Sequence, residues 1–364
     1  MAKPTMSDYV AETAKVVRRQ ISQHPEKPLV EAFLSNPRHV IRIIACGSSR
    51  NAAELSRPYL RHILGREVLV TEPRAFCEYE HQLVAREFCV VISQSGYSTN
   101  ALDALRCLRD LGEAPFGITG DVASDFSQLA DPLIDYGVGE ELVGYVTKGV
   151  TSLTTFLALF GIGVAEREGR LSEAEASRER EDIESLMEGF EETRVATPLL
   201  LERRYKELSS MGPTFFCGSG PNYGLAREGV LKYAECLQIP AFALELEEFL
   251  HGPNLQINPR YTLFLLALGQ RSWNRTQQIA QASRTVTDHV FVITDAPAET
   301  GAADIRITRR GPELLAPLQA LPFFQLTAWQ LTEDEHLWHK HPLVARFDAE
   351  LSGKSENYVD KEVL

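Results

Sequence analysis

The stretch VIRIIACGSSRN, residues 40–51, decides the fold. Its first seven residues are apolar except for Arg42, and they run directly into a glycine and two serines. A strand that is apolar almost throughout is typical of a parallel sheet that helices cover on both faces. A second stretch, PTFFCGSGPN at residues 213–222, repeats the order of apolar strand, Cys-Gly-Ser, small residue, variable residue and Asn. This repeat, about 170 residues apart, predicts two similar α/β domains.

Further short apolar strands follow each of these stretches and alternate with helical patterns. In the first half they are EVLVT, FCVVIS, PFGIT and, more weakly, LIDYG; in the second half they are TLFLLALG, HVFVITD and ADIRIT. Strands that alternate with helices in this way indicate parallel sheets. We therefore predict an α/β protein with two doubly wound parallel-sheet domains, flavodoxin-like or Rossmann-like, joined by a helical linker.

An abrupt change of composition marks the predicted domain boundary. Residues 147–165 form an apolar helical pattern, whereas residues 166–182, EREGRLSEAEASRERED, are charged and offer no apolar face to bury. We expect an exposed helical connector there. The predicted parts are an N-terminal helical segment (1–36), a first domain (37–165), a helical linker (166–209), a second domain (210–332) and a C-terminal tail (333–364).

The composition and net charge of the chain limit which classes of binding partner are expected. The chain has 364 residues, of which 44% are hydrophobic, and a formal net charge of −13 at pH 7. Nucleic acids and anionic membranes bind basic surfaces, so neither is an expected partner. The six cysteines include no Cys-x-x-Cys pair, which indicates buried thiols in a reducing compartment. The N-terminus has no apolar signal core, and we read no apolar run as long enough to span a bilayer, so we expect a cytoplasmic protein.

Three polar segments should meet at the ligand end of the first sheet, because ligands bind beyond the carboxyl ends of parallel strands. They are Cys46-Gly47-Ser48-Ser49, Ser93-Gln94-Ser95-Gly96-Tyr97-Ser98 and Thr147-Lys148. Serine hydroxyls and the free N–H groups at a helix start can both donate to a phosphate. The alternative is that the serines are only helix caps and turn residues. No Gly-Lys-Ser/Thr follows, which disfavours a nucleotide-binding loop.

The second half contains a candidate acid–base segment. Glu228, Lys232 and Glu235 are spaced to lie on one face of a helix that follows a Gly-Ser-Gly turn. A solvated charged stripe would have the same spacing. His251 precedes Gly-Pro in a predicted loop, where it could be idle or could exchange a proton near neutral pH.

Taken in order, CGSSRNAAE, SQSGYSTNALDAL and YVTKGVTSL resemble the three ligand loops of the first sugar isomerase (SIS) domain in the isomerase half of glucosamine-6-phosphate synthase. The resemblance covers roughly residues 37–330 and implies two SIS domains with the active site between them. It implies that the phosphate ligands are Ser49, Ser93, Gln94, Ser95 and Ser98. It implies that Cys46, Gly47 and Ser48 line the sugar, and the third loop adds Gly144, Thr147 and Lys148 to the predicted substrate-binding set.

The segment E-G-x-x-K-x-x-E followed by E-x-x-H-G-P resembles the catalytic segment of the same synthase. The resemblance implies that Glu235 moves a proton between sugar C1 and C2, and that His251 opens the ring; we place Lys232 with them in the predicted catalytic set. In that family the histidine comes from the neighbouring subunit, which implies a homodimer or a higher homo-oligomer. This chemistry transfers no hydride, so no cofactor is expected.

Two departures from the synthase pattern change the expected reaction. No N-terminal cysteine hydrolase domain precedes Cys46, and the chain ends VDKEVL, which matches only the start of the synthase tail, so Lys361 is given no role. We therefore favour a deglycase that splits a 6-phosphorylated sugar–amine conjugate, related in kind to fructosamine and glucoselysine 6-phosphate deglycases. Two tyrosines beside the loops, Tyr97 and Tyr145, could border an amino-acid moiety or could simply pack in the core.

Two alternatives to the deglycase stay open. Amino-sugar phosphate deaminases use the same chemistry, but their loops typically read Arg-Gly-Ser-Ser and Ala-Thr-Lys. A sugar-phosphate sensor would bind without turnover, and the retention of Glu235 and His251 argues against it. One other cluster, His336, His339 and His341, has spacing that could bind a metal, but no fourth ligand is evident, so we predict a surface segment and no metal site.

Overall fold

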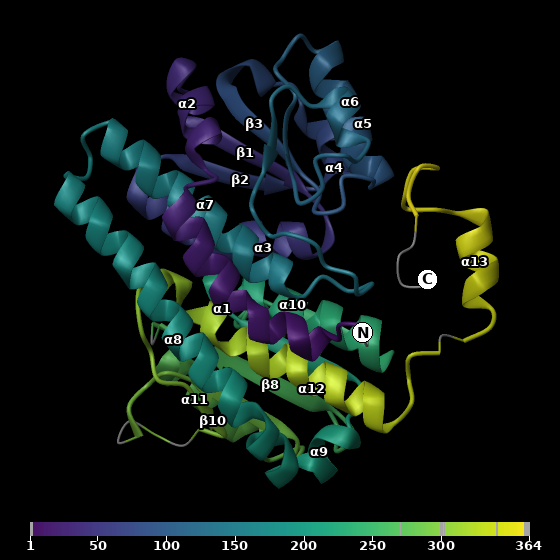
Figure 1. Cartoon of the computed structure of the whole chain (residues 1–364). Helices are drawn as coiled ribbons and strands as arrows, with labels where there is room; N and C mark the ends of the chain where they lie inside the picture. The colour runs from purple at the N-terminus through teal and green to yellow at the C-terminus, as the bar shows by residue number, and fades with distance from the viewer. Residues whose placement is uncertain (1–2, 270, 299–300, 302, 340, 360–364) are drawn as a thin grey trace. The chain divides into compact units, whose positions relative to one another are not determined.

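A computed structural model describes residues 3–269, 271–298, 301, 303–339 and 341–359. These residues form two compact units, each built around a five-stranded parallel sheet (Figure 1). The first unit comprises residues 3–4, 15–180 and 339–359, and the second comprises residues 5–14 and 181–338. Two helices, α1 (Met6–Gln23) and α8 (Glu173–Arg203), contribute residues to both units.

The first sheet has the strand order β2-β1-β3-β4-β5, and every neighbouring pair is parallel. The strands are β1 (Val40–Ala45), β2 (Glu67–Thr71), β3 (Glu87–Ile92), β4 (Phe116–Thr119) and β5 (Leu133–Asp135). The helices of this unit are α2 (Lys27–Ser35), α3 (Gly47–Leu64), α4 (Pro73–Ala75), α5 (Thr99–Asp110), α6 (Phe126–Leu129), α7 (Lys148–Arg167) and α13 (Val344–Glu350).

The second sheet has the order β10-β9-β8-β6-β7, which is the order of the first sheet read from the other edge. Its strands are β6 (Thr214–Gly218), β7 (Ala241–Leu244), β8 (Thr262–Ala267), β9 (Val290–Thr294) and β10 (Ile305–Arg306). Its helices are α9 (Tyr205–Ser209), α10 (Pro221–Lys232), α11 (Trp273–Ser283) and α12 (Leu321–Asp334). Each half therefore has the flavodoxin-like order 2-1-3-4-5, and the predicted internal repeat and α/β class are confirmed.

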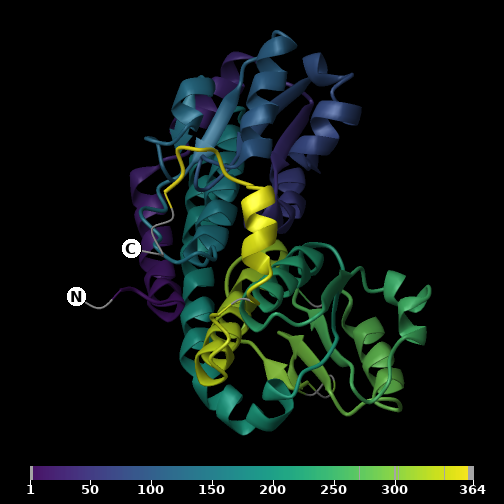
Figure 2. The same cartoon turned by 90° about the vertical axis from the view of Figure 1, so that its right-hand side faces the viewer.

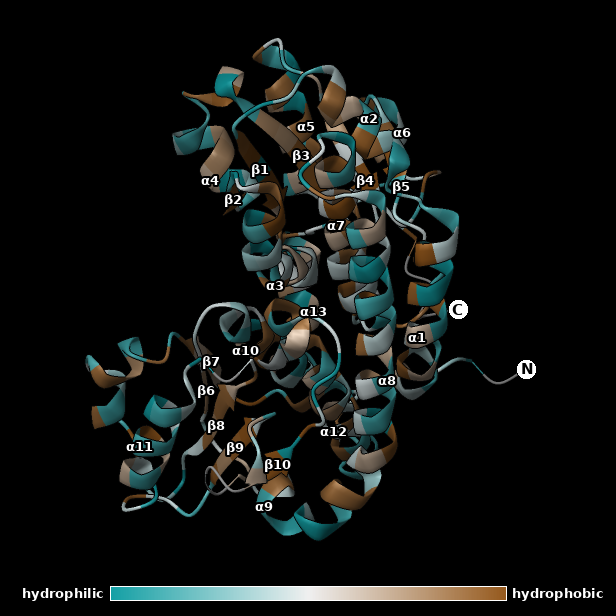
Figure 3. Ribbon diagram, turned by 90° about the vertical axis from the view of Figure 1, so that its left-hand side faces the viewer, coloured by the Kyte–Doolittle hydropathy of each residue, from teal (hydrophilic) through white to brown (hydrophobic). Residues whose placement is uncertain are grey.

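The cores follow from the apolar strands that the sequence contains, which stand out as hydrophobic ribbon in Figure 3. In β6, Phe215 and Cys217 pack in one cluster with Trp273 of α11, because alternate side chains of a strand point to the same face. Phe216, between them, points the other way and lies edge-on to Tyr233 and stacked on Phe264. Both faces of the strand are thus buried, as an apolar run with few polar positions requires.

The one charged residue in β1 is satisfied inside the sheet. Arg42 is buried, and its guanidinium donates to both carboxylate oxygens of Glu87 on β3 at 2.5 and 2.8 Å. It also donates to the Thr71 hydroxyl on β2 at 2.7 Å and to Glu80 at 2.8 Å. The two acids raise the pKa of Arg42 despite its burial, so the guanidinium stays charged.

Two expectations about helices need correction. The apolar helix α7 is long enough to span a membrane by length and composition, but 94% of its 18-residue apolar window is buried inside the structure, as in the core helix of a water-soluble domain. Its Gly161 lies so close to α3 that an added Cβ would come within 2.9 Å of Leu60 and Ile63. The connector α8 is not fully exposed: Ala176 is buried, as are the residues that continue its inner face, Ile183, Leu186, Met187 and Phe190.

Candidate active site

The strand order fixes where a ligand can bind in the first unit. Neighbouring strands β1 and β3 are connected to opposite edges of the sheet, so a crevice forms where their carboxyl ends diverge. Residues 46–49 follow β1, and residues 93–98 follow β3. Asn100, in the first turn of α5 just after the second loop, donates its side-chain amide to the sulfur of Cys46 in the first loop at 3.3 Å. The structure therefore brings together the first two predicted ligand loops.

The first loop turns directly into helix α3. Gly47 has a positive φ of 58°, a conformation that favours glycine, and in the described part of the chain no atom beyond its chain neighbours and its own helix backbone lies within 4 Å of where its Cβ would be. Cys46 is exposed, Ser48 is buried and Ser49 is half-buried. The open space at Gly47 and the exposed sulfur of Cys46 leave this loop accessible to a ligand.

The second loop is a compact set of hydroxyl groups. Ser93 Oγ donates to Ser98 Oγ at 3.3 Å and accepts from the Gly96 N–H at 3.2 Å. Ser95 Oγ accepts from the Tyr97 N–H at 3.3 Å. Gly96 also has a positive φ of 68°, and a Cβ there would lie 1.8 Å from Ser124 Oγ. The glycine thus permits the tight turn that gathers the three serines.

A lysine from the C-terminal part of the chain reaches this loop. Lys354 Nζ lies 2.8 Å from Ser95 Oγ and 3.3 Å from Ser98 Oγ. No local sequence pattern indicates this contact, because the partners are more than 250 residues apart. Lys361, which the sequence left without a role, lies outside the described residues.

The third loop is organised by a carboxylate that the sequence analysis missed. Glu141 Oε1 accepts from the backbone N–H groups of Thr147 and Lys148 at 2.9 and 2.8 Å, and Oε2 accepts from Gln94 Nε2 at 2.6 Å. Burial raises the pKa of Glu141, although all three donors favour its charged form. The backbone N–H groups of Thr147 and Lys148, at the start of α7, therefore already donate to Glu141 of the same chain.

This arrangement changes the expected role of two predicted residues. The Gln94 amide is committed to Glu141, and its Oε1 lies against Gly149, where a Cβ would be only 1.8 Å away. Gln94 therefore has its backbone N–H, but not its side chain, to offer a phosphate. Thr147 and Lys148 are buried at the start of α7, and Gly144 is exposed in the loop before it.

In the second unit the acid–base segment is a buried ion cluster, not a solvated stripe. Glu228 and Lys232 side chains are fully buried, and the Glu235 side chain is 26% exposed. Lys232 Nζ lies 2.5 Å from Glu235 Oε2 and 3.6 Å from Glu228 Oε1. Burial alone would lower the pKa of Lys232, but the two carboxylates outweigh it and raise that pKa above its ordinary value. Lys232 is thus a fixed cation that holds one oxygen of Glu235.

Helix geometry changes at the proposed proton carrier. The α10 helix ends at Lys232, and residues Tyr233–Leu237 continue as a π-turn. Such turns often occur at functional sites, because the wider ring moves a side chain out of the regular helical register. Glu235 lies in this turn, and among the described residues no donor is bonded to its Oε1. That oxygen is available to take a proton.

The loop that bears His251 is anchored at the end of β6. Glu245 Oε1 accepts from Ser219 Oγ at 2.6 Å, and its Oε2 accepts from the Glu247 N–H at 2.7 Å. Ser219 lies in the Gly-Ser-Gly turn before α10, so one carboxylate ties the histidine loop to the helix that carries Lys232. His251 itself is exposed, and its ring makes no hydrogen bond within the described part of the chain.

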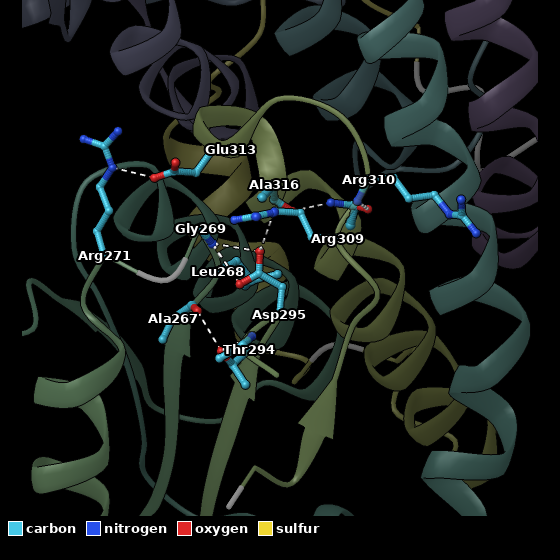
Figure 4. A network of polar contacts seen from close by, with 12 residues as sticks. Ala267, Leu268, Gly269, Arg271, Thr294, Asp295, Arg309, Arg310, Glu313 and Ala316 are labelled. Carbon is cyan, nitrogen blue, oxygen red and sulfur yellow. Dashed lines mark hydrogen bonds and ion pairs between the residues drawn. The ribbon is translucent and has the colours of Figure 1, made fainter. Parts of the chain in front are cut away.

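Figure 4 shows polar contacts at the equivalent strand ends of the second sheet, where a threonine and an aspartate follow one another. Thr294 at the end of β9 donates to the Ala267 carbonyl at 2.9 Å. The next residue, Asp295, is buried and accepts from the Gly269 N–H at 3.1 Å with each oxygen. Arg309 lies 3.7 Å from the same carboxylate. Burial raises the pKa of Asp295, whereas these two partners lower it.

The first sheet has a related arrangement with a glycine in place of the aspartate. Thr119 at the end of β4 donates to the Gln94 carbonyl at 3.2 Å, one residue further along the neighbouring loop than the position equivalent to Ala267. Gly120 then stands where the second sheet has Asp295. In the second sheet the Asp295 carboxylate thus lies at the loop after β8, whereas in the first sheet the loop after β3 contains serine hydroxyl groups.

Across the described residues, no group of three or more His, Cys, Asp or Glu side chains is arranged to hold a metal ion. His336 and His339 flank the end of the second unit, and His341 Nδ1 accepts from the Leu343 N–H at 3.2 Å.

Comparison with known families agrees with this geometry. Residues 33–162, which include β1 to β5 and all three loops, match the family model described as SIS domain. The first unit contains a SIS domain. The match confirms the family resemblance that the loop motifs indicated.

Two curated proteins that resemble this chain are aminotransferases. It is 27% identical over 299 residues to glutamine–fructose-6-phosphate aminotransferase (isomerizing) of Aeropyrum pernix, which covers 79% of this chain and 47% of that protein. It is 27% identical over 243 residues to a human glutamine–fructose-6-phosphate aminotransferase (isomerizing), covering 66% of this chain and 35% of the human protein. The chain thus spans about half, or less, of the length of these relatives.

Solved structures share the fold. A Clostridium difficile protein provisionally described as a phosphosugar isomerase has a TM-score of 0.85 and 24% identity, over 98% of this chain and 100% of that one. The C-terminal domain of glucosamine-fructose-6-phosphate aminotransferase from Francisella tularensis has a TM-score of 0.81 and 21% identity, over 92% and 97% of the two chains. At these identities the likeness establishes the fold alone.

Removing the buried cation should destabilise the protein in a pH-dependent way. Lys232→Met removes the cation beside the buried Glu228 carboxylate, and breaking a buried pair in this way typically costs about 3–5 kcal/mol. The raised pKa of Lys232 means that the wild-type pairing is fully present at neutral pH and is lost only as the pH rises through that pKa. In the variant the deficit should shrink as the pH falls, because Glu228 then takes up a proton.

Chemical denaturation at several pH values measures this effect. Lys206→Met, at an exposed position, is the matched control and should change the free energy of unfolding by less than about 0.5 kcal/mol. A deficit for Lys232→Met that stays constant or grows at low pH would contradict the ion-cluster assignment.

Loss of the loop hydroxyls should weaken phosphate binding. Hydrogen bonds to charged groups contribute about 1.5–3 kcal/mol each, so Ser95→Ala with Ser98→Ala should weaken binding of a hexose 6-phosphate at least about a hundredfold. Calorimetric titration measures the dissociation constant, and exposed Ser35→Ala is the control. Unchanged affinity in the double variant would show that the phosphate binds elsewhere.

Proposed function

We propose that the protein is a phosphosugar deglycase that cleaves a 6-phosphorylated sugar–amine, of fructosamine or glucosylamine type, to hexose 6-phosphate and a free amine. The observation that carries the proposal is the pairing of a positioned, partly exposed carboxylate, Glu235, with the buried cation Lys232. The serine loop of a SIS domain in the same chain supports a phosphorylated substrate. Structurally similar proteins include one described as a tagatose-6-phosphate ketose/aldose isomerase and one described as a glucosamine-6-phosphate deaminase. The activities in these descriptions belong to the same class of chemistry as the proposed reaction.

In the proposed reaction Glu235 acts as base and then as acid. For a fructosamine substrate, its free Oε1 removes a proton from C1, beside the C2 carbonyl, and an enaminol forms between C1 and C2. Glu235 then returns the proton to C2, which leaves an imine at C1. Water adds to that imine and the amine departs, so substrate plus water gives hexose 6-phosphate plus amine. No oxidant or reductant is needed.

Other residues have supporting roles in this proposal. Lys232 donates to Glu235 Oε2 throughout and so presents Oε1 to the substrate. His251 assists ring opening or amine departure, and its loop is held by Glu245. Ser49, Ser93, Ser95 and Ser98 bind the phosphate, with Gln94 offering its backbone N–H, while Cys46, Gly47 and Ser48 border the sugar. We further propose that the protein is a cytoplasmic homodimer or higher homo-oligomer.

A substrate panel tests the reaction. Fructosamine 6-phosphates, glucosylamine 6-phosphates and hexosamine 6-phosphates are incubated with enzyme, and released amino acid and ammonia are measured. We expect amino acid from one of the first two classes. Glu235→Gln should reduce kcat by about 10²–10⁴-fold while affinity for the sugar phosphate is kept. Glu192→Gln, at an exposed ion pair with Arg310, is the matched control and should retain full activity.

Other results from the panel would favour the alternatives. Ammonia release from a hexosamine 6-phosphate alone would replace the deglycase with a deaminase. Tight binding of sugar phosphate without turnover of any panel member would indicate a sensor.

Mixing two inactive variants tests whether His251 acts across subunits. If it is donated by a partner, a mixed dimer of Glu235→Gln and His251→Ala subunits holds one site with both residues intact. Equal mixing should then restore about a quarter of wild-type activity, because half of the dimers are mixed and each has one of two sites intact. Subunit exchange is verified with differently labelled chains. No recovery after verified exchange would place both residues in one chain or remove one of them from catalysis.

A further inference from the structure

The segment of residues 352–358 lies beside residues 97–99, at the end of the second loop of the first unit (Figure 2). It is called the C-terminal strap here. Lys354 forms an antiparallel bridge with Ser98, and the Ser355 N–H donates to the Tyr97 carbonyl at 2.9 Å. The Thr99 N–H, at the start of α5, donates to the Gly353 carbonyl at 3.1 Å. The strap is therefore held by backbone hydrogen bonds on both sides of the Lys354 side chain.

The Lys354 ammonium fixes the direction of the serine hydroxyls. An ammonium can only donate, so Ser95 Oγ and Ser98 Oγ must accept from it. Ser95 Oγ also accepts from the Tyr97 N–H, and Ser98 Oγ also accepts from Ser93 Oγ. Neither hydroxyl donates to an acceptor in the described part of the chain. The hydroxyl protons of Ser95 and Ser98 and the third N–H of the Lys354 ammonium are therefore three donors for which the described residues provide no acceptor.

The charge of Lys354 has no carboxylate partner among the described residues. Burial lowers its pKa, and no carboxylate among the described residues forms an ion pair with it. The Tyr358 ring lies 5.3 Å from Nζ and offers only a weak cation–π contact. A half-buried cation is less stable than an exposed one unless an anion meets it. An anion with several acceptor oxygens would satisfy both the cation and the two hydroxyl protons.

We propose that Lys354 supplies the positive charge that binds the substrate's phosphate, and so makes the site select a phosphorylated sugar over the free sugar. This inference rests on the proposed phosphate site at Ser95 and Ser98. It adds a charged ligand, brought from the far end of the chain, to a loop that otherwise offers hydroxyl and backbone donors. It also gives a strongly acidic protein a local means of attracting a dianion.

Titration calorimetry with fructose 6-phosphate, inorganic phosphate and fructose tests the role of the charge. Lys354→Met keeps the length of the side chain without its charge and should weaken binding of both phosphates about tenfold to a hundredfold. Fructose binding should not change. Lys354→Arg should recover most of the loss. Increasing salt should weaken binding to wild type more than to Lys354→Met, because a charge pair is screened.

A second variant separates charge from the position of the strap. Asn357→Ala removes the 2.9 Å contact from Asn357 Nδ2 to Asp125 but leaves Lys354 charged, and its loss of affinity should be much smaller. In turnover assays Lys354→Met should raise KM with little change in kcat. Exposed Lys206→Met should alter neither.

Three results would overturn the inference. Unchanged or tighter phosphate binding by Lys354→Met would mean that the lysine only pins the strap or blocks the site. An equal loss in Asn357→Ala would assign the effect to strap position and not to charge. Failure of the wild type to bind either phosphate would remove the proposed phosphate site, and the inference with it. If Ser95→Ala with Ser98→Ala loses affinity while Lys354→Met does not, only the role of Lys354 falls.

Discussion

The strand order at the centre of each parallel sheet is the constraint on which the rest of the structure depends. In both sheets the first and third strands lie side by side, and their connections leave toward opposite edges. The loops after β1 and β3 must therefore emerge next to each other, and so must those after β6 and β8. Buried apolar strands keep these ends fixed, so side chains on the loops are positioned by the sheet core rather than by loop contacts alone.

The two sheets share this scaffold but use it differently. In the first sheet the residue after β4 is Gly120, and serines gather on the loop after β3. In the second sheet Asp295 occupies the equivalent place and holds the Gly269 N–H, with Arg309 close by. The first repeat thus presents serine hydroxyl groups at this position, while the second has a buried carboxylate there. The second repeat instead has a buried ion cluster at the end of α10, where Lys232 pairs with Glu235 of the π-turn that follows.

Much of the fold could be predicted from local pattern. Apolar strands that alternate with helices specify the α/β class, and the paired Cys-Gly-Ser stretches specify the repeat. The pattern also indicated which loops follow the strands, and Ser93, Ser95 and Ser98 do gather in one of them. Strand order could not be predicted, because any order satisfies the same apolar periodicity. The apolar face of α8 was missed because charged residues dominate the start of that helix.

The parts of the site that escaped prediction depend on contacts without a local pattern. Glu141 binds backbone N–H groups six and seven residues later, and such a contact follows from the path of a loop rather than from residue type. Lys354 meets Ser95 across 259 residues. The burial of Glu228 and Lys232 was equally hidden, because i, i+4 spacing is the same for a solvated stripe and for a buried ion cluster.

In the proposed reaction a proton leaves one sugar carbon and a proton enters its neighbour before the amine departs. The most direct measurement uses a fructosamine 6-phosphate with two deuterium atoms on C1, with the product analysed by NMR and mass spectrometry. Proton abstraction by Glu235 predicts a slowed reaction and an aldose 6-phosphate that retains one deuterium on C1. A ketose 6-phosphate that retains both deuterium atoms on C1 would show direct displacement of the amine and would contradict the account.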